Sequence, residues 1–317
     1  MKALITGANG FAGTHLVEFL LSGGWEILGL TNDLELNPEL RVVPGRFILR
    51  EIDIGDSNSL LRALKDFAPD HVFHLAAVTA KGVSREAVDE LFNVNVRGTQ
   101  NLLFSAIESG LNSSVVVTGS SACYGSSGAD RDSALTEESV LAPATIYGAS
   151  KLAQEMLASS LGKSTGLPVK VTRAFNHTGP GEGPHMACSS FAKQIAECEL
   201  GRGSVVRVGN LNSYRDYCDV RDVVRAYVLV AVKACPGEVF NVCSGKAVRM
   251  RTILEMLVSM SGKKIEIVED PGKFKPADVS YHRGDFSKIN RELGWKPEID
   301  LEKTLSDLLN YWRNRLK

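Results

Sequence analysis

Residues 6–13 read TGANGFAG, and this glycine-rich stretch decides the fold. It follows a short apolar run, Ala3–Ile5, and opens a helical pattern over Ala12–Leu21. In this context the first glycine permits a tight turn, the second lets the backbone approach a pyrophosphate, and the third allows close helix–sheet packing. The N-terminus of the following helix then faces the anion. The three glycines are Gly7, Gly10 and Gly13. We expect them to form a dinucleotide-binding loop, where a lone glycine pattern would indicate only an ordinary turn.

The alternation of short apolar runs with longer helical patterns continues through the first half of the chain. The expected strands are Ala3–Ile5, Glu26–Leu30, Phe47–Ile52, His71–Leu75, Ser114–Val117 and Val169–Arg173. The expected helices between them are Ala12–Leu21, Ser57–Phe67, Ala87–Ser109 and Ser150–Leu161. This order predicts an α/β fold, a Rossmann-type doubly wound parallel sheet covered on both faces.

The pattern changes after about Arg173, where Asn176–Pro184 is rich in glycine and proline and is expected to be a loop. Asp300 is a candidate cap for a last helix with one apolar face. The second half has no regular strand–helix rhythm and predicts a smaller α+β lobe over the carboxyl ends of the sheet, where such sheets bind ligands. We expect residues 1–175 with about 217–244 to form the dinucleotide-binding domain, and about 176–216 with 245–317 to form a second, substrate-binding domain.

Composition and charge exclude several classes of protein. The 317 residues carry a formal net charge of −1, which gives no electrostatic attraction to nucleic acid or an anionic membrane. No apolar run approaches the ~18 residues of a membrane span, and the start, MKALITGANG, does not resemble a signal peptide. The six cysteines form no CxxC pair and no metal-ligand spacing with histidine. We expect reduced, packed cysteines, no metal site and a cytoplasmic location.

The end of the second strand is expected to select the cofactor. An acidic residue there suits the free ribose hydroxyl of NAD, and a basic residue suits the phosphate of NADP. This chain has Thr31 and Asn32, with Asp33 close enough to reach back, so the choice stays open. The other residues expected to line the cofactor are Asn9, Phe11, Asp53, Ile54, Leu75, Ala76 and Ala77, together with Tyr147 and Lys151 farther along the chain.

Tyr147 and Lys151 are four residues apart in YGASK, so on a helix they share one face. An ammonium beside a phenol favours the phenolate and lowers the pKa of the tyrosine from about 10. Such a tyrosine can exchange a proton with a sugar hydroxyl near neutral pH, and the lysine can hold the nicotinamide ribose. The pair alone is typical of a solvated surface, but the glycine loop and Ser120 upstream favour an active site.

The chain resembles the nucleotide-sugar branch of the extended short-chain dehydrogenase/reductase family nearly from end to end. The motifs that carry the resemblance are TGANGFAG at 6–13, HLAA at 74–77, NVNVRGTQNLL at 93–103, SSACYG at 120–125, YGASK at 147–151, RAFNHTGPGE at 173–182, RDYCDVRDVVRAY at 215–227 and LGWKP at 293–297. The resemblance implies that Ser120, Tyr147 and Lys151 are the catalytic trio, with Asn95 supporting it. It also implies a homodimer through a four-helix bundle, here Ala87–Ser109 and Ser150–Leu161.

Residue 122 distinguishes among the reactions of this family. The sugar 4,6-dehydratases that the chain resembles carry Thr-Asp-Glu or Thr-Ser-Glu where this chain has Ser120, Ser121 and Ala122. Their glutamate removes the proton next to the 4-ketone so that water leaves from C6, and an alanine methyl cannot act as a base. Hydride transfer at C4 needs only a hydroxyl to hold the oxygen and a tyrosine to move its proton. The residues therefore favour a reductase or an epimerase.

NHTGPGE followed by FNVCSGKAVRM is similar to GDP-4-keto-6-deoxy-D-mannose reductases, which make GDP-D-rhamnose with NAD(P)H. By that resemblance the second domain binds a GDP-sugar, and Arg215 is a natural diphosphate clamp because a guanidinium offers a fork of donors. The residues expected to bind the substrate are Thr79, Ser121, Asn176, Lys193, Arg215, Arg249 and Asp278. Those reductases often carry Glu after the paired serines and Arg near the second strand's end, where this chain has Ala122 and Asn32. On that account the exact substrate stays open, and the cofactor is expected to be NADP(H) or NAD(H), with only a weak preference for NADP(H).

Two other functions remain to be distinguished. A UDP-sugar 4-epimerase would use the same trio and regenerate a bound NAD in each turnover, and a non-catalytic NAD(P) sensor would use the fold alone. A reductase would show net oxidation of the cofactor. An epimerase would turn over the sugar without net oxidation of the cofactor, and a sensor would show neither sugar turnover nor cofactor oxidation. The stereochemistry at C4 depends on which face of the ketone meets the nicotinamide, and the sequence does not fix it.

Overall fold

Five strands of the first half of the chain join β6 and β10 of the second half in a seven-stranded sheet in which every neighbouring pair is parallel. A computed structural model describes residues 1–33, 45–79, 82–125, 133–273 and 279–317. The strands lie in the order β10-β6-β5-β4-β1-β2-β3. Their bounds are β1 Lys2–Thr6, β2 Glu26–Thr31, β3 Phe47–Glu51, β4 His71–His74, β5 Ser114–Ser120, β6 Val169–Ala174 and β10 Val239–Val242. The predicted doubly wound α/β fold is confirmed.

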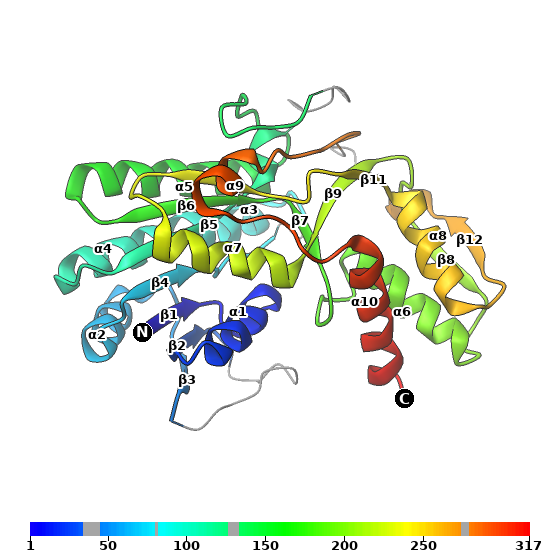
Figure 1. Cartoon of the computed structure of the whole chain (residues 1–317), viewed down its shortest axis with the longest axis horizontal. Helices are drawn as coiled ribbons and strands as arrows, with labels where there is room; N and C mark the ends of the chain where they lie inside the picture. The colour runs from blue at the N-terminus through cyan, green and yellow to red at the C-terminus, as the bar shows by residue number, and fades with distance from the viewer. Residues whose placement is uncertain (34–44, 80–81, 126–132, 274–278) are drawn as a thin grey trace.

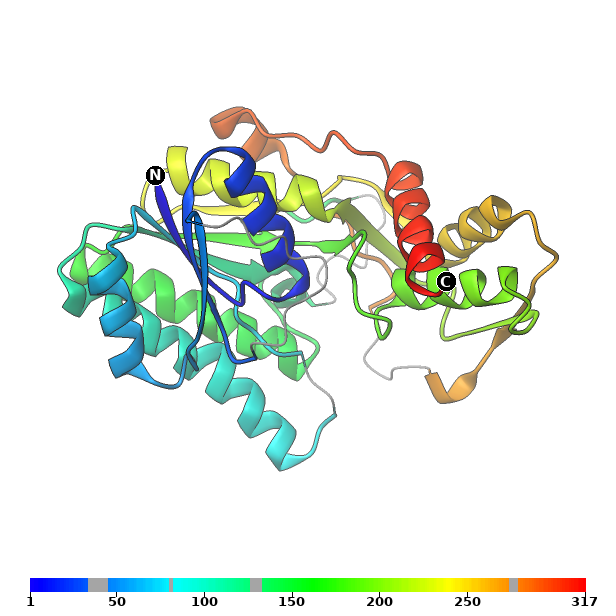
Figure 2. The same cartoon turned by 90° about the horizontal axis from the view of Figure 1, so that it is seen from below.

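Helices cover both faces of this sheet, because its strands are apolar on both sides. In β1, Ala3 and Ile5 pack toward the layer of α1 (Phe11–Ser22), α7 (Val220–Lys233) and α9 (Ser287–Leu293). Leu4 between them packs toward the opposite layer of helices. That layer consists of α2 (Ser57–Phe67), α4 (Thr99–Ser109) and α5 (Ile146–Thr165). Figure 2 shows the sheet between the two layers.

The strand order reverses between β1 and β4, which places a crevice at the carboxyl ends of these strands. Ligands bind at such a switch point in open α/β sheets. The glycine loop follows β1, and Leu75–Ala77 follow β4, so both segments border this crevice. The fold therefore brings the predicted cofactor residues of two distant segments to one place.

The second lobe lies beside the carboxyl ends of the sheet (Figure 1). Its helices are α6 (Ala187–Glu199), α8 (Met250–Ser261) and α10 (Leu301–Arg315), which share a separate apolar core. Two small sheets accompany them, β11-β9-β7 and β12-β8. Their bounds are β7 Asn176–Thr178, β8 Val205–Val208, β9 Tyr214–Asp219, β11 Ala247–Arg249 and β12 Glu266–Glu269. Asp300 caps α10 by accepting from the Lys303 N–H at 2.7 Å, as the sequence predicts.

Two predictions of secondary structure are wrong in detail. The expected continuous helix over Ala87–Ser109 is α3 (Arg85–Phe92), a π-helical turn over Asn93–Gly98, and α4. The wider turn buries the Asn95 side chain, and a Cβ on Gly98 would lie 2.4 Å from Ile54 Cδ1. The expected loop over Asn176–Pro184 begins instead with β7, a strand too short to leave a periodic pattern.

Three further observations concern cysteine packing, membrane-spanning helices and metal ligands. All six cysteines are free, and five of them are buried, which confirms that most are packing residues. In the described part of the chain, no helix is long and apolar enough to cross a membrane. No three His, Cys, Asp or Glu side chains of the described residues gather as metal ligands.

Candidate active site

The glycine loop leaves no room for side chains at its first and third glycines. Gly7 has φ +70°, and a Cβ there would lie 2.9 Å from the Ala76 nitrogen. A Cβ on Gly13 would lie 2.1 Å from the Gly7 carbonyl oxygen. The Gly10 N–H donates to that oxygen at 3.0 Å, and Gly10 caps α1 without a side chain. The first turn of α1 therefore presents its amides with no competing cap, as binding of a pyrophosphate requires.

Thr31 ends β2, as predicted, but its hydroxyl is hydrogen-bonded to the backbone of Asp33 in the turn that follows. It donates to the Asp33 carbonyl oxygen at 2.9 Å and accepts from the Asp33 N–H at 3.2 Å. The Asn9 amide donates to the same carbonyl oxygen at 3.3 Å, and Asn32 is exposed. The residues expected to read the adenosine ribose thus form one turn directly beside the glycine loop.

The segments after β3 and β4 complete this side of the crevice. The Ala76 N–H donates to Thr6 Oγ1 at 3.2 Å, and the Leu75 N–H donates to the Thr6 carbonyl oxygen, also at 3.2 Å. Asp53 accepts from the Gly55 N–H at 2.7 Å, while Ile54 is buried. These bonds fix the backbone that the sequence predicts to lie beneath the cofactor.

Ser120 and Tyr147 come together because a short turn packs against the start of a helix. Ser120 ends β5, and a 3₁₀ turn over Ser121–Tyr124 follows it. Thr145 caps α5 by accepting from the Gly148 N–H at 3.0 Å, which places Tyr147 in the first helical turn. A Cβ on Gly148 would lie 2.5 Å from the Ala122 carbonyl oxygen, so turn and helix are in direct backbone contact. A hydrogen bond with the Ser120 hydroxyl acts on the Tyr147 phenol.

Lys151 is buried one turn after Tyr147, and its ammonium donates to the Thr118 carbonyl oxygen at 2.6 Å. Burial lowers the pKa of Lys151 to about 7, and the Glu155 carboxylate opposes that shift. Burial also raises the pKa of Tyr147, with the bond to Ser120 acting in the other direction. The expected lowering of the tyrosine pKa by the lysine is therefore wrong for this structure. The physical reason is that desolvation of the phenol is the largest influence on its pKa, while the Lys151 ammonium is bonded to a carbonyl oxygen instead of the phenol.

A buried polar network lies beneath the trio. Thr99 Oγ1 donates to the Asn95 carbonyl oxygen at 2.6 Å, so the His74 Nε2 that contacts it at 2.8 Å is its N–H donor. His74 Nδ1 then accepts from Thr6 Oγ1 at 2.7 Å. Burial lowers the pKa of His74 to about 3, which keeps the imidazole neutral. His74 thereby ties the start of the glycine loop to α4.

Asn95 reaches the trio through its neighbours. Its amide nitrogen donates to Ser150 Oγ at 3.0 Å and to the Val78 carbonyl oxygen at 3.0 Å. Its amide oxygen accepts from the Val78 N–H at 2.9 Å. The Ser150 hydroxyl in turn donates to the Tyr147 carbonyl oxygen at 2.8 Å. Asn95 therefore holds the backbone of α5 between Tyr147 and Lys151.

Asn176 and Arg215 lie on neighbouring strands of the small sheet between the lobes. β7 and β9 run parallel, with Asn176 opposite Tyr217, so Asn176 and Arg215 project from the same face. Arg215 is half-buried, and its Nη1 donates to the Tyr214 carbonyl oxygen at 2.8 Å. Burial and the Arg215 guanidinium both lower the pKa of His282, and the effect of the guanidinium places the two side chains close together.

The remaining predicted substrate residues are more scattered. Arg249 ends β11 and donates to Asn212 Oδ1, and Lys193 contacts Glu197 at 3.8 Å and the Trp312 ring at 5.7 Å. Thr79 is exposed after β4, and Ser121 is buried beside Ser120. Asp278 lies outside the described residues. Of these, Ser121 and Thr79 lie on the segments that border the crevice, while Lys193 is tied to α10.

His282 is a residue at the site that sequence reasoning missed. Its backbone N–H donates to the Tyr214 carbonyl oxygen at 3.2 Å, and its ring lies 5.0 Å from that of Phe175. Burial and Arg215 together lower its pKa to about 4, while a contact with the Ser121 backbone raises it. His282 lies in a segment without periodicity, so no pattern pointed to it.

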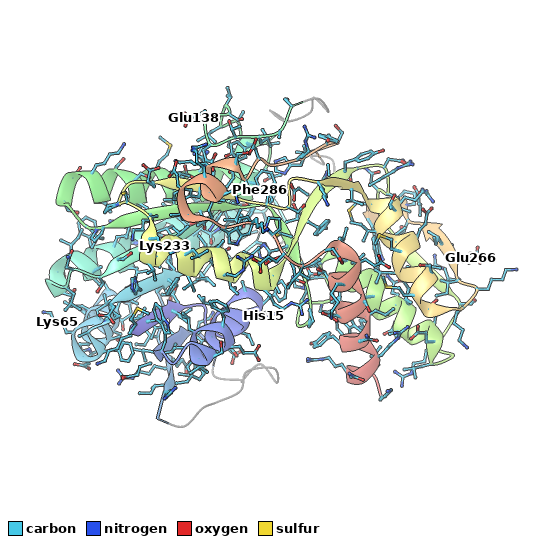
Figure 3. The ribbon with its side chains drawn as sticks, in the orientation of Figure 1. His15, Lys65, Glu138, Lys233, Glu266 and Phe286 are labelled. Carbon is cyan, nitrogen blue, oxygen red and sulfur yellow. The ribbon has the colours of Figure 1, made fainter. Side chains whose placement is uncertain are left out.

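Two contacts join β7 and the segment that follows it to the glycine loop and α1. The His177 ring stacks on Phe11 with 5.9 Å between centroids and 12° between planes. His15, labelled in Figure 3, contacts the Pro180 carbonyl oxygen through Nε2 at 2.8 Å. These contacts fix β7 and the segment after it over the N-terminal end of α1.

This sheet order, with a glycine loop at the switch point and a serine, a tyrosine and a lysine gathered beyond it, defines an NAD(P)-dependent oxidoreductase of the extended short-chain dehydrogenase/reductase type. A family model described as GDP-mannose 4,6 dehydratase matches residues 4–308, and the chain belongs to that family.

Individual relatives carry several reactions. The chain is 32% identical over 320 residues to a GDP-6-deoxy-D-mannose reductase of Pseudomonas aeruginosa, covering 100% of this chain and 98% of that protein. It is 26% identical to a GDP-mannose 4,6-dehydratase of Yersinia enterocolitica, over 97% of this chain and 92% of that one.

The similar solved structures likewise belong to proteins with different reactions. The structure of RMD from Pseudomonas aeruginosa complexed with NADPH has a TM-score of 0.84 at 30% identity and covers 99% of both chains. A UDP-glucose 4-epimerase from Thermotoga maritima with UDP-glucose has a TM-score of 0.87 at 26% identity and covers 100% of both. Similarity alone therefore leaves the reaction to be argued from the site.

Proposed function

We propose that this chain reduces the C4 ketone of a nucleotide-activated 4-keto-6-deoxy sugar with NAD(P)H, most specifically GDP-4-keto-6-deoxy-D-mannose to GDP-D-rhamnose. The observation that carries the proposal is the turn after β5, where Ser120 faces Tyr147 and the next positions are Ser121 and Ala122. The full-length similarity to a GDP-6-deoxy-D-mannose reductase supports the choice of sugar.

The residue at position 122 argues against elimination. No side chain from Ser120 to Gly125 is acidic, and the Ala122 backbone is held against Gly148 of α5. A dehydratase needs a base for the C5 proton, whereas reduction at C4 needs a hydride and one proton. The family description names a dehydratase, but this turn has the groups for the reduction alone.

The side chains divide the proton chemistry of the reduction between them. NAD(P)H supplies the hydride that adds to the carbonyl carbon when it is bound. The Ser120 hydroxyl would donate a hydrogen bond to the carbonyl oxygen, and the Tyr147 phenol would deliver its proton to that oxygen as charge develops. Burial raises the pKa of Tyr147, so the phenol carries the proton that a reductase must give at neutral pH.

The cofactor site fits a dinucleotide. Gly7 and Gly13 lack room for a Cβ, so the loop keeps its backbone open to a pyrophosphate. Lys151 would exchange its bond to the Thr118 carbonyl oxygen for the nicotinamide ribose. A weak preference for NADP(H) over NAD(H) is supported by the similar structure with NADPH and by Asn32, which is not acidic. NAD(H) is the alternative, since a similar structure, a Thermus thermophilus UDP-glucose 4-epimerase, is in complex with NAD. That structure has a TM-score of 0.87 at 28% identity.

We propose that residues of about 176–216 and 245–317 bind the GDP part of the substrate, with residues 1–175 and about 217–244 binding the cofactor. Arg215 would hold the diphosphate with its fork of donors, and Asn176 on the same face of β7 would bond the sugar or phosphate. His282 lies close to Arg215, but burial and that guanidinium lower its pKa to about 4, so near neutral pH its imidazole is uncharged and would offer a hydrogen bond rather than a second positive charge.

We further propose that two copies associate through α3, α4 and α5. Large apolar side chains are exposed on all three helices: Phe92 at 38%, Phe104 at 41% and Met156 at 61%. Burying such a surface against a second copy would form the four-helix bundle expected from the family resemblance. Light scattering of wild type and Phe104→Glu tests this, with a monomeric variant expected.

The decisive assay presents GDP-, UDP- and dTDP-linked 4-keto-6-deoxy sugars with NADPH or NADH and follows the absorbance of the reduced nicotinamide. Consumption with the GDP-sugar and formation of a GDP-6-deoxyhexose are expected. A preference for UDP- or dTDP-sugars would contradict the assignment of the base. Consumption with none of them would contradict the reductase.

A 4-epimerase is the second candidate, favoured by the two UDP-glucose 4-epimerase structures with TM-scores of 0.87. An epimerase would interconvert a UDP-hexose while its cofactor shows no net change. Incubation with UDP-glucose and analysis of the sugar by chromatography separates the two reactions.

A further inference from the structure

The helix that carries Tyr147 and Lys151 continues their face with a buried acid. Glu155 lies one turn after Lys151, so the three side chains share one face of α5. Its carboxylate is bound in a bidentate manner by Arg173 of β6: Nε lies 3.0 Å from Oε2, and Nη2 lies 2.6 Å from Oε1. Each residue of the pair is 5% exposed. The pair therefore joins α5 to the sheet in a water-excluded place.

The other end of the same guanidinium holds the turn that follows Ser120. Arg173 Nη1 donates to the Tyr124 phenol oxygen at 2.8 Å and to the Glu137 carbonyl oxygen at 2.9 Å. The Tyr124 hydroxyl donates in turn to Asn241 Oδ1 at 2.7 Å. The guanidinium carbon lies 5.1 Å from the centre of the Tyr124 ring. One side chain thus binds both the helix with the general acid and the turn with the serine.

The 3₁₀ turn after Ser120 and the start of α5 are packed too closely to shift freely against each other. Tyr124 ends the 3₁₀ turn that Ser121 begins, and the Ala122 carbonyl oxygen already touches the backbone of Gly148. A shift of α5 along its axis would move Tyr147 past Ser120 and break the two parallel bonds to Arg173. Because those bonds fix direction as well as distance, the pair sets the register of helix against turn.

We propose that Glu155 and Arg173 are positioning residues, which hold Tyr147 and Lys151 in register with Ser120 through one shared guanidinium. The inference rests on the proposed function of the trio. Stability alone does not account for the pair, because apolar residues of similar volume often replace a buried ion pair without loss. A misplacement of about 1 Å at a reacting centre, in contrast, can lower turnover by about 10²-fold.

Electrostatics agree with this geometry. The Glu155 carboxylate raises the pKa of Lys151 against the effect of burial. The other groups that face Lys151 are neutral or balanced: His74 is uncharged, Tyr147 keeps its proton, and Arg173 neutralises Glu155. Removing the acid alone would leave the buried Arg173 guanidinium without its carboxylate and would lower the pKa of Lys151 further, so single substitutions are poor tests.

The test replaces both partners at once, in Glu155→Leu/Arg173→Met. The matched control is Glu199→Leu/Arg313→Met, which removes a bidentate pair between α6 and α10 with distances of 2.8 and 2.6 Å. Melting temperature, NADPH affinity, KM and kcat are measured for both with the GDP-4-keto-6-deoxy sugar. We expect both double variants to fold and to bind NADPH within about threefold of wild type. We expect kcat to fall about 10- to 100-fold only in the Glu155/Arg173 variant, with KM little changed.

A folded Glu155/Arg173 variant with kcat within twofold of wild type would overturn the proposal, as would an equal loss in the control. Should the double variant not fold, Tyr124→Phe decides, since it removes only the hydroxyl that Arg173 binds: a three- to tenfold loss of kcat is expected, and none would overturn it. If wild type reduces none of the sugars, the proposed function fails, and a crystal structure of the double variant tests the positioning alone. In that crystal structure we expect Tyr147 to be displaced from Ser120 by about 1 Å. An unchanged distance between Tyr147 and Ser120 would overturn the proposal.

Discussion

Replacing Tyr147 by phenylalanine removes one hydroxyl and leaves the ring in the first turn of α5. General acid–base groups contribute about 10²–10⁴-fold to a rate. The lower part of that range is expected here, because the Ser120 hydroxyl next to the phenol still polarises the ketone. We expect kcat to fall about 10²–10³-fold, or about 2.7–4.1 kcal/mol in the barrier.

Cofactor binding in the same variant should be nearly unchanged, because the Lys151 ammonium is held by the Thr118 carbonyl oxygen and not by the phenol. The assay is stopped-flow reduction of the GDP-4-keto-6-deoxy sugar, with NADPH affinity measured by its fluorescence. Tyr311→Phe, which also loses a phenol hydroxyl but lies on α10, serves as the control and should retain wild-type kcat. Turnover of Tyr147→Phe within fivefold of wild type would refute the assignment of the proton donor.

Three further changes probe other parts of the account. Arg215→Ala should raise KM about 10- to 150-fold with little effect on kcat, because a charge-assisted bond is worth roughly 1.5–3 kcal/mol; an unchanged KM in steady-state kinetics would place Arg215 outside the pocket. Gly13→Ala should weaken NADPH binding at least about tenfold and destabilise the fold by about 1–3 kcal/mol, since its Cβ would meet the Gly7 carbonyl oxygen at 2.1 Å; normal affinity by fluorescence titration would be inconsistent with the close approach. Glu182 lies buried just after β7, where its carboxyl accepts from Thr178 Oγ1 at 2.6 Å. Burial raises the pKa of Glu182 to about 8, so between its unfolded pKa of 4.5 and about 8 the folded state holds the extra proton and stability falls as pH rises. Thermal melts of wild type and Glu182→Gln should therefore diverge in favour of the variant as pH rises through this window, and parallel curves would contradict the shift.

The parts of the fold that repeat a local pattern were predictable from the sequence. The glycine spacing after Ala3–Ile5 predicts the first turn, and the structure gives its physical basis in the contact between Gly13 and the Gly7 carbonyl oxygen. Thr31 was placed correctly at the end of β2, because a buried strand is marked by its run of apolar residues. Strand–helix alternation then predicts the parallel sheet.

Features that depend on contacts between distant segments were not predictable. The strands β7 and β11 have three residues each and are paired with β9 only by the tertiary fold, and the π-helical turn that buries Asn95 leaves no pattern in the sequence. The pKa of Tyr147 depends on how deeply the phenol is buried, which a spacing of four residues does not reveal. His282 approaches Arg215 only after the chain has returned from the second lobe.

The ion pair of Glu155 and Arg173 is another feature that the sequence alone does not predict. Glu155 could be placed on the face of Lys151 from its spacing, but its partner lies on a strand 18 residues away. Only the packing of α5 on β6 brings the two together and joins them to the turn after Ser120. Residues that position a catalytic group are therefore harder to find in a sequence than the group itself.

The most direct test of the central claim is incubation of the wild-type protein with GDP-mannose and NAD(P) in deuterated water, followed by mass spectrometry. With Ala122 in place of a base, we expect no loss of water and no deuterium at C5. The same protein given the preformed GDP-4-keto-6-deoxy sugar and NADPH should yield a GDP-6-deoxyhexose and an equal amount of oxidised cofactor. Conversion of GDP-mannose to the 4-keto-6-deoxy sugar by the wild type would contradict the account, because another residue would then have to remove the C5 proton.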